Sequence, residues 1–165
     1  MIDIIPLAAV DPVAVERLLD RAFEPERRGR TAYKVRGDAL PIPALSFAAV
    51  EHGAPVGSVQ CWPVRFRPDA GAPAPLVMVG PVAVAPERQG VGLGRRLMDG
   101  ALAAAAGTGL DDGLVLIGDP DYYGRLFGFT AGRTGAWRLP GPVERHRLLA
   151  RGSRVPAGPG ELGPV

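Results

Sequence analysis

The sequence is poor in cysteine, in lysine and in long apolar runs, and each shortage excludes a class of protein. Its 165 residues include one cysteine, Cys61, which excludes an internal disulfide and a cysteine-based metal site. No apolar run is long enough to span a bilayer, and no signal-peptide pattern opens the chain. We therefore expect a cytoplasmic protein that has no membrane partner and uses no metal.

The charge balance does not favour nucleic acid as a partner. The net charge is only +2, and Lys34 is the single lysine among 19 basic residues. The arginines are scattered apart from a small cluster at Arg27, Arg28 and Arg30. Because no basic stripe with interleaved aromatic residues is present, we expect no nucleic-acid partner and interpret the cluster as a solvated face.

Length and composition predict one folded domain. The apolar fraction of 47% is ordinary for a globular protein. The 23 glycines and 18 prolines separate grouped apolar runs, which indicates many tight turns rather than disorder. No linker or repeat divides the chain. We predict a single domain over residues 1–165, with a tail at 157–165 that has little to bury and can fray.

Hydrophobic spacing and turn residues predict an alternating order of strands and helices. Strands are expected at 1–6, 45–50, 56–66, 76–84, 114–118, 136–139 and 143–149, and helices at 11–23, 31–35, 93–106 and from 119. The strands at 45–50 and 56–66 form an antiparallel hairpin, and the strand at 114–118 is parallel to the one before the helix. This predicts an α/β (α+β) fold with a mixed sheet of about six to seven strands and helices on both faces.

The stretch from Val77 to Leu97 carries the clearest chemistry. An apolar strand enters a glycine loop that opens a helix, an arrangement whose backbone N–H groups bind phosphate or pyrophosphate. A nucleotide P-loop is excluded, because Gly94 is followed by arginine and not by Lys-Ser/Thr. The dinucleotide pattern G-x-G-x-x-G fails as well, since the glycines stand at 90, 92 and 94.

Two patterns together identify a family. The first is Q/R-x-x-G-x-G/A, which fits without a gap at Gln89-Gly90-Val91-Gly92-Leu93-Gly94. The second runs Gly118-Asp119-Pro120-x-Tyr122-Tyr123-Gly124-Arg125 and precedes Gly128-Phe129. With both patterns in this order, nearly the whole chain resembles the GCN5-related N-acetyltransferase (GNAT) superfamily, in particular its branch of small predicted acetyltransferases.

The resemblance implies acetyl-CoA as cosubstrate, with its pyrophosphate in the glycine loop. Gly80-Pro81 predicts a bulge in the strand before the loop. In this superfamily such a bulge splays that strand from its parallel neighbour, and the pantetheine arm pairs with the exposed backbone. Arg88, Arg95 and Arg96 are candidates for a phosphate charge. The implied cofactor contacts are Val82, Ala83, Val84, Gln89, Gly90, Val91, Gly92, Leu93, Gly94, Arg95 and Tyr123.

The implied reaction moves the acetyl group to an amine of a small molecule or protein, by direct attack in a ternary complex. The Val82 N–H is our candidate for polarising the thioester carbonyl. Tyr123 is the expected general acid, with Tyr122 as the alternative. The spacing departs from the family here: the tyrosine usually stands five residues before the phenylalanine of Gly-Phe, a position that Gly124 occupies.

The general base stays open. The family commonly places a carboxylate on the strand before the loop, but residues 76–84 contain none. Because this carboxylate is absent, we retain a second hypothesis: a non-catalytic acyl-CoA sensor or interaction module of the same fold. We interpret Cys61 as a small core or cleft residue, and the terminal strands allow a homodimer. The candidate bases, each also readable as a surface, turn or helix-start group, are Glu87, Asp119, Asp121, Glu51 and His52.

Overall fold

The computed structural model describes all residues, 1–165, and contains an eight-stranded mixed sheet in the order β1-β2-β3-β4-β5-β7, with β8 beside β3 and β6 beside β8. The strands are β1 Asp3–Pro6, β2 Phe47–Glu51, β3 Ala54–Pro68, β4 Ala74–Val84, β5 Leu114–Ile117, β6 Trp137–Arg138, β7 Leu148–Arg151 and β8 Gly160–Gly163. The helices are α1 Pro12–Phe23, α2 Thr31–Arg36, α3 Leu93–Gly107 and α4 Pro120–Phe127, with five 3-10 turns: η1 Leu7–Ala9, η2 Pro25–Gly29, η3 Pro43–Leu45, η4 Pro86–Arg88 and η5 Arg145–Arg147.

The predicted fold class is confirmed. β1, β2 and β3 pair antiparallel, and β4 and β5 form the parallel pair. The chain divides into two compact units, which we describe separately. The first contains Met1–Arg28, Pro41–Cys61 and Val79–Thr108, and the second contains Gly29–Leu40, Trp62–Met78 and Gly109–Val165. The long strands β3 and β4 contribute residues to both units.

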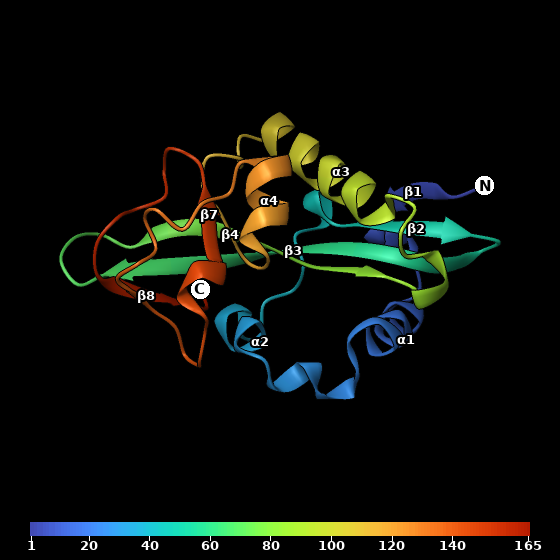
Figure 1. Ribbon diagram of the computed structural model, residues 1–165, viewed down its shortest axis with the longest axis horizontal. Coiled ribbons are helices and arrows are strands. Elements are labelled where there is room, and N and C mark those ends of the chain that lie inside the picture. The colour runs from blue at the N-terminus through green and yellow to red at the C-terminus, as the bar shows by residue number, and fades with distance from the viewer. The chain divides into compact units, whose positions relative to one another are not determined.

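In the first unit, α1 and α3 lie on opposite sides of the strands (Figure 1). Asp11 caps α1 by accepting a hydrogen bond from the Val13 N–H at 3.0 Å, as the Asp-Pro pair predicts. Helix α3 packs closely on β3 at Gly57, where an added Cβ would lie 3.0 Å from the Leu97 side chain. In this unit, η4 and the glycine loop connect the end of β4 at Val84 to the start of α3 at Leu93.

The arginine-rich stretch after α1 is more ordered than a solvated face. Arg27 is buried, with a side chain only 1% exposed, and it pairs with Glu16 and Asp20 on α1. Arg28 reaches the same two carboxylates with a side chain that is 53% exposed. The cluster therefore fastens η2 onto α1.

In the second unit, α2 and α4 lie on opposite sides of the strands (Figure 1). The core centres on Trp137, which stacks on Phe66 with 4.3 Å between ring centroids. Val64, Met78 and Val115 belong to the same buried cluster. Aromatic pairs of this kind add stability beyond the apolar area that they bury.

The tail that we expected to fray is instead a strand. Gly160–Gly163 form β8, which pairs antiparallel with β3 and parallel with β6. An added Cβ at Gly160 would lie 2.5 Å from the Phe66 ring and 2.6 Å from the Arg67 carbonyl oxygen. Leu162 is buried in the core. The tail is thus held by contacts to residues far earlier in the chain, which its local composition does not reveal.

Smaller differences from the expected boundaries lie at helix and strand ends. The strand expected at 143–149 begins only at Leu148, because η5 occupies Arg145–Arg147. Gly107 is the last residue of α3, and Thr108 provides the cap with its N–H on the Ala104 carbonyl. No helix of the chain is both long and apolar enough to cross a membrane.

The two neighbouring arginines at η2 provide a matched test of burial. We expect Arg27→Ala to lower the free energy of unfolding by about 2–4 kcal/mol, because a buried stem and its ion pairs are lost together. Arg28→Ala, which faces the same acids from solvent, should cost less than about 1 kcal/mol. Urea unfolding followed by circular dichroism measures both, and equal losses would contradict this assignment.

Candidate active site

The glycine loop presents unbonded backbone donors at the start of α3. Gly90 and Gly92 have φ angles of +85° and +81°, a region that suits glycine. The N–H groups of Gly90, Val91 and Gly92 donate to no other group of the chain. No side chain caps the first turn of α3, and no acidic residue stands there. Such a turn is built to hold an anion.

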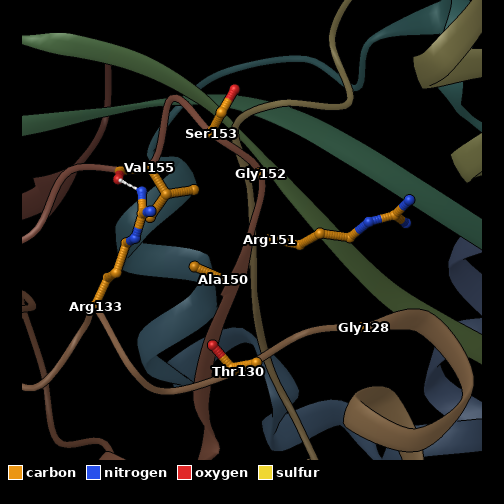
Figure 2. A pocket seen from close by; sticks show the side chains of 8 residues that line it. All are labelled: Gly128, Thr130, Arg133, Ala150, Arg151, Gly152, Ser153 and Val155. Carbon is orange, nitrogen blue, oxygen red and sulfur yellow. Dashed lines mark hydrogen bonds between the residues drawn. The ribbon is translucent and has the colours of Figure 1, made fainter.

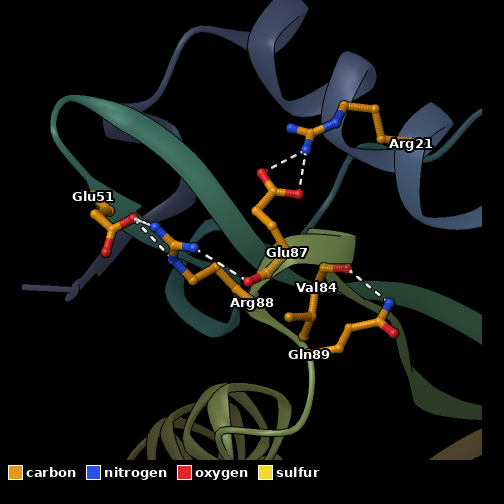
Figure 3. Close-up of polar contacts among 6 residues, drawn as sticks. All are labelled: Arg21, Glu51, Val84, Glu87, Arg88 and Gln89. Atoms are coloured by element: carbon orange, nitrogen blue, oxygen red, sulfur yellow. Dashed lines mark hydrogen bonds and ion pairs between the residues drawn. The ribbon is translucent and has the colours of Figure 1, made fainter.

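Two further loop residues connect it to β4. The Gln89 amide donates to the Val84 carbonyl oxygen at 3.3 Å (Figure 3), so this side chain turns back onto the strand. A Cβ at Gly94 would lie 3.7 Å from Val84 and 3.8 Å from Val82, an ordinary contact distance. This explains why the pattern accepts either glycine or alanine at that position.

Two ion pairs fix η4 immediately before the loop. Glu87 accepts hydrogen bonds from the Arg21 guanidinium on α1 at 2.5 and 2.6 Å. Arg88 donates from Nε to Glu51 at 2.9 Å, and its Nη2 pairs with the same carboxylate. Figure 3 shows these pairs reaching η4 from two different elements. Arg88 is therefore engaged by Glu51, which leaves the exposed Arg95 and Arg96 as the candidates for a phosphate charge.

The hydrogen-bonded ladder between β4 and β5 is short. It joins Val77 to Leu114 and Met78 to Val115 and goes no further, although β4 continues to Val84. Beyond the ladder, Gly80 has a φ of +114° and Pro81 follows through a cis peptide. Pro81 has no N–H to give to a neighbouring strand. The interruption predicted at Gly80-Pro81 thus falls where the parallel pairing has ended.

The start of α4, in the second unit, fixes the position of Tyr123. Asp119 caps the helix by accepting from the Asp121 N–H at 3.0 Å. The Tyr123 ring packs edge-on against Tyr122, with 4.9 Å between centroids at 85°. Burial raises the pKa of the Tyr123 phenol, while the charge of Arg147 acts in the opposite direction. The phenol is therefore a proton donor at neutral pH. Val82, the other predicted catalytic residue, belongs to the first unit.

Helix α4 ends after Tyr123 in a common glycine cap. The Phe129 N–H bonds to the carbonyl oxygen of Tyr123, six residues back, at 3.2 Å. Gly128 ends the helix with a left-handed φ of 76°. The turn that carries Tyr123 is a regular one, since its N–H bonds to the Asp119 carbonyl at 2.9 Å. Helix α4 is thus continuous from Pro120 to Phe127 in spite of the departure in spacing.

Comparison with known proteins agrees with this geometry. Residues 13–129 match the Acetyltransferase (GNAT) family. The chain belongs to this family. A GNAT acetyltransferase from Brucella melitensis, solved in complex with acetyl-CoA, is 30% identical over 97% of this chain and 94% of that one, with a TM-score of 0.67. The GNAT N-acetyltransferase YhbS from Escherichia coli, solved with CoA, is 25% identical over 98% and 88%, with a TM-score of 0.71. No curated protein matches the chain.

None of the carboxylates considered as the base of this GNAT chain stands unengaged in a cleft. Glu87 and Glu51 are ion-paired, and hydrogen bonds from Arg21 and Arg88 lower the pKa of the respective carboxyl groups. Asp119 caps α4 and Asp121 lies exposed in its first turn. His52 sits exposed at the tip of the β2–β3 hairpin. No group of three or more His, Cys, Asp or Glu side chains is placed to hold a metal ion.

A cavity of about 310 Å³ in the second unit holds none of the predicted site residues. Arg133 enters it and donates to the Val155 carbonyl oxygen at 2.8 Å, whereas the Arg151 side chain points away (Figure 2). The lining has no carboxylate, imidazole or thiol, so it offers no general base. Its residues are Gly128, Thr130, Arg133, Ala150, Arg151, Gly152, Ser153 and Val155.

The contacts of three residues in this geometry could not be predicted from the sequence. Arg21 stands 66 residues before its partner Glu87, and no local pattern connects them. Arg147 and Gly118 meet through a β5–β7 contact that only the sheet creates. For Gly118, its place inside the second sequence pattern was the one available signal.

Cys61 yields a direct chemical test. Its side chain is buried, and burial raises the pKa of the thiol to about 12. The native thiol should therefore be inert toward a disulfide reagent such as dithiobis(nitrobenzoate) at about pH 8, because only the thiolate reacts. Unfolding in urea should release one equivalent of chromophore. A native reaction as fast as that of the unfolded chain would contradict the burial.

Proposed function

We propose that this chain is an acetyl-CoA-dependent N-acetyltransferase that moves the acetyl group to an amine of a small molecule or protein. Attack would occur directly, in a ternary complex. The observation that carries the proposal is the glycine loop, whose N–H groups at Gly90, Val91 and Gly92 have no partner in the chain. Support comes from the relative from Brucella melitensis, which was solved with acetyl-CoA.

The cofactor would be held mainly by backbone groups. The loop N–H groups would donate to the pyrophosphate, aided by the helix dipole of α3. Arg95 and Arg96 would add charge beside a nucleotide phosphate. The pantetheine amides would pair with β4 at Val82 and Val84, beyond the end of the ladder with β5 at Met78. This mode resembles the addition of a strand.

The proposed reaction begins with a neutral amine that attacks the thioester carbonyl. The Val82 N–H would stabilise the oxyanion, a contribution of about 3 kcal/mol for one fixed donor. The new nitrogen–carbon bond forms and the carbon–sulfur bond breaks, with its electron pair left on sulfur, while the attacking nitrogen releases one proton to solvent. Tyr123, protonated because burial raises its pKa, would then give its proton to the thiolate. Tyr122 is the alternative donor.

The lack of an available general base supports a second candidate function. Residues 76–84 contain no carboxylate, and Glu51 and Glu87 are held by arginines. A domain that lacks a base could bind an acyl-CoA without transferring the acyl group, as a sensor or interaction module. The cytoplasmic setting that we infer is common to both candidates. So is the homodimer, which the terminal strands allow.

Binding of the cofactor is tested by calorimetric titration with acetyl-CoA. We expect Gly92→Glu to weaken binding at least tenfold, about 1.4 kcal/mol, because it adds a carboxylate at the anion site. Gly100→Glu is the matched control: this glycine lies on α3, and a Cβ there meets nothing within 4 Å. It should bind as the unaltered chain does. The absence of heat with the unaltered chain would refute both candidate functions.

Turnover is tested by thiol release from acetyl-CoA with a panel of amines. Tyr123→Phe should reduce kcat by about 10²-fold, the usual contribution of a general acid. Tyr122→Phe should retain most of the activity. Full turnover by Tyr123→Phe would show that the acid is assigned wrongly. Binding without turnover on any amine would favour the sensor.

A further inference from the structure

The junction between β5 and α4 contains a glycine that the proposed chemistry does not explain. Gly118 is not in the left-handed region, so freedom of the backbone is not its reason. An added Cβ would lie 2.5 Å from Cε2 and 2.8 Å from Cδ2 of the Tyr123 ring. Contacts under 3.0 Å force something to move. Glycine is therefore required here because the ring lies directly against the backbone.

The ring of Tyr123 is restrained from its other sides as well. Phe129 meets it at 6.5 Å between centroids and 80°, and Phe127 at 6.2 Å. Tyr122 adds the edge-on contact described above. The backbone of Tyr123 is held at both its N–H and its carbonyl oxygen. The ring therefore has one packed orientation, and Gly118 forms one wall of its site.

The backbone of Arg147, the last residue of η5, contacts Gly118. Its carbonyl oxygen accepts the Gly118 N–H at 2.9 Å, next to the β5–β7 pair of Ile117 and Leu148. The charged and titratable groups that act on the Tyr123 phenol are Tyr122 and Asp119, which raise its pKa, and Arg147, which lowers it. Arg147 is thus the cation that favours the phenolate.

We propose that Gly118 and Arg147 are positioning residues for Tyr123: the bare backbone of Gly118 orients the ring, and the Arg147 guanidinium stabilises the phenolate left after proton transfer. The proposal rests on the proposed function. When the thiolate takes the Tyr123 proton, a negative charge remains on a half-buried oxygen until solvent reprotonates it. The charge of Arg147, whose backbone is bonded to Gly118, acts on that oxygen and reduces the energetic cost of this state.

Alkaline ultraviolet difference titration tests Arg147 without any turnover. The chain has three tyrosines, and the Tyr123→Phe variant identifies the phase that belongs to Tyr123. We expect Arg147→Gln to move that phase to higher pH, Arg147→Lys to retain it, and Arg151→Gln on β7 to leave it unchanged. Circular dichroism confirms that the fold persists across the titrated range. An unmoved phase in Arg147→Gln would overturn this half of the proposal even if the enzyme is active.

Kinetics test Gly118. We expect Gly118→Ala to lower kcat by about 10²-fold, as misplacement of a reacting group by about 1 Å does, with an unchanged KM for acetyl-CoA. Gly135→Ala is the control in the same unit, since its Cβ meets nothing within 4 Å. In a Tyr123→Phe background, Gly118→Ala should cause no further loss of kcat, because it acts through that ring.

The kinetic outcomes separate the two proposals. A full second loss in the double variant, or an equal effect on KM and kcat, would show that Gly118 has only a general structural role. Arg147→Gln should lower kcat by about tenfold, with rescue by Arg147→Lys. If no amine supports turnover, the proposed function fails, while the tyrosine titration still decides whether Arg147 acts on Tyr123. If the Gly118→Ala variant does not fold, the results for the Arg147→Gln variant alone decide the proposal.

Discussion

Backbone groups without an intramolecular partner are the constraint on which the site depends. Backbone N–H groups of a folded protein are met by the chain, by water or by a ligand, and those of the exposed residues Gly90, Val91 and Gly92 donate to nothing in the chain. The parallel ladder also ends at Met78, well before β4 does. Such groups must be met by water or by a ligand. A ligand with a pyrophosphate and a run of amides would meet this requirement, which supports acetyl-CoA as the proposed cosubstrate.

Ion pairs with arginine engage two of the acidic groups near the glycine loop. In the first unit, Arg21 pairs with Glu87 just before the glycine loop, and Arg88 pairs with Glu51 in the β2–β3 hairpin. These pairs hold η4 in place immediately before the loop. The same pairs lower the pKa of the carboxyl groups of Glu87 and Glu51. Two of the five candidate bases are therefore held in ion pairs with arginine.

The second unit holds the half-buried Tyr123 ring in one packed orientation. Gly118 supplies space, α4 supplies a capped and regular first turn, and Phe129 closes the ring's far side. The helix ends after the tyrosine, where the Phe129 N–H bonds to the Tyr123 carbonyl oxygen.

The sequence by itself determined the class of fold, the order of elements and the glycine loop before α3. These features follow from local physics: strand and helix periodicity, Asp and Pro at helix starts, and glycines at positive φ. Only the tertiary structure decided the partners of Arg21, Arg88 and Arg27, the strand formed by Gly160–Gly163, and the contact between Gly118 and Tyr123. Those features join residues far apart in the chain or depend on spaces smaller than a methyl group, and no local pattern encodes either.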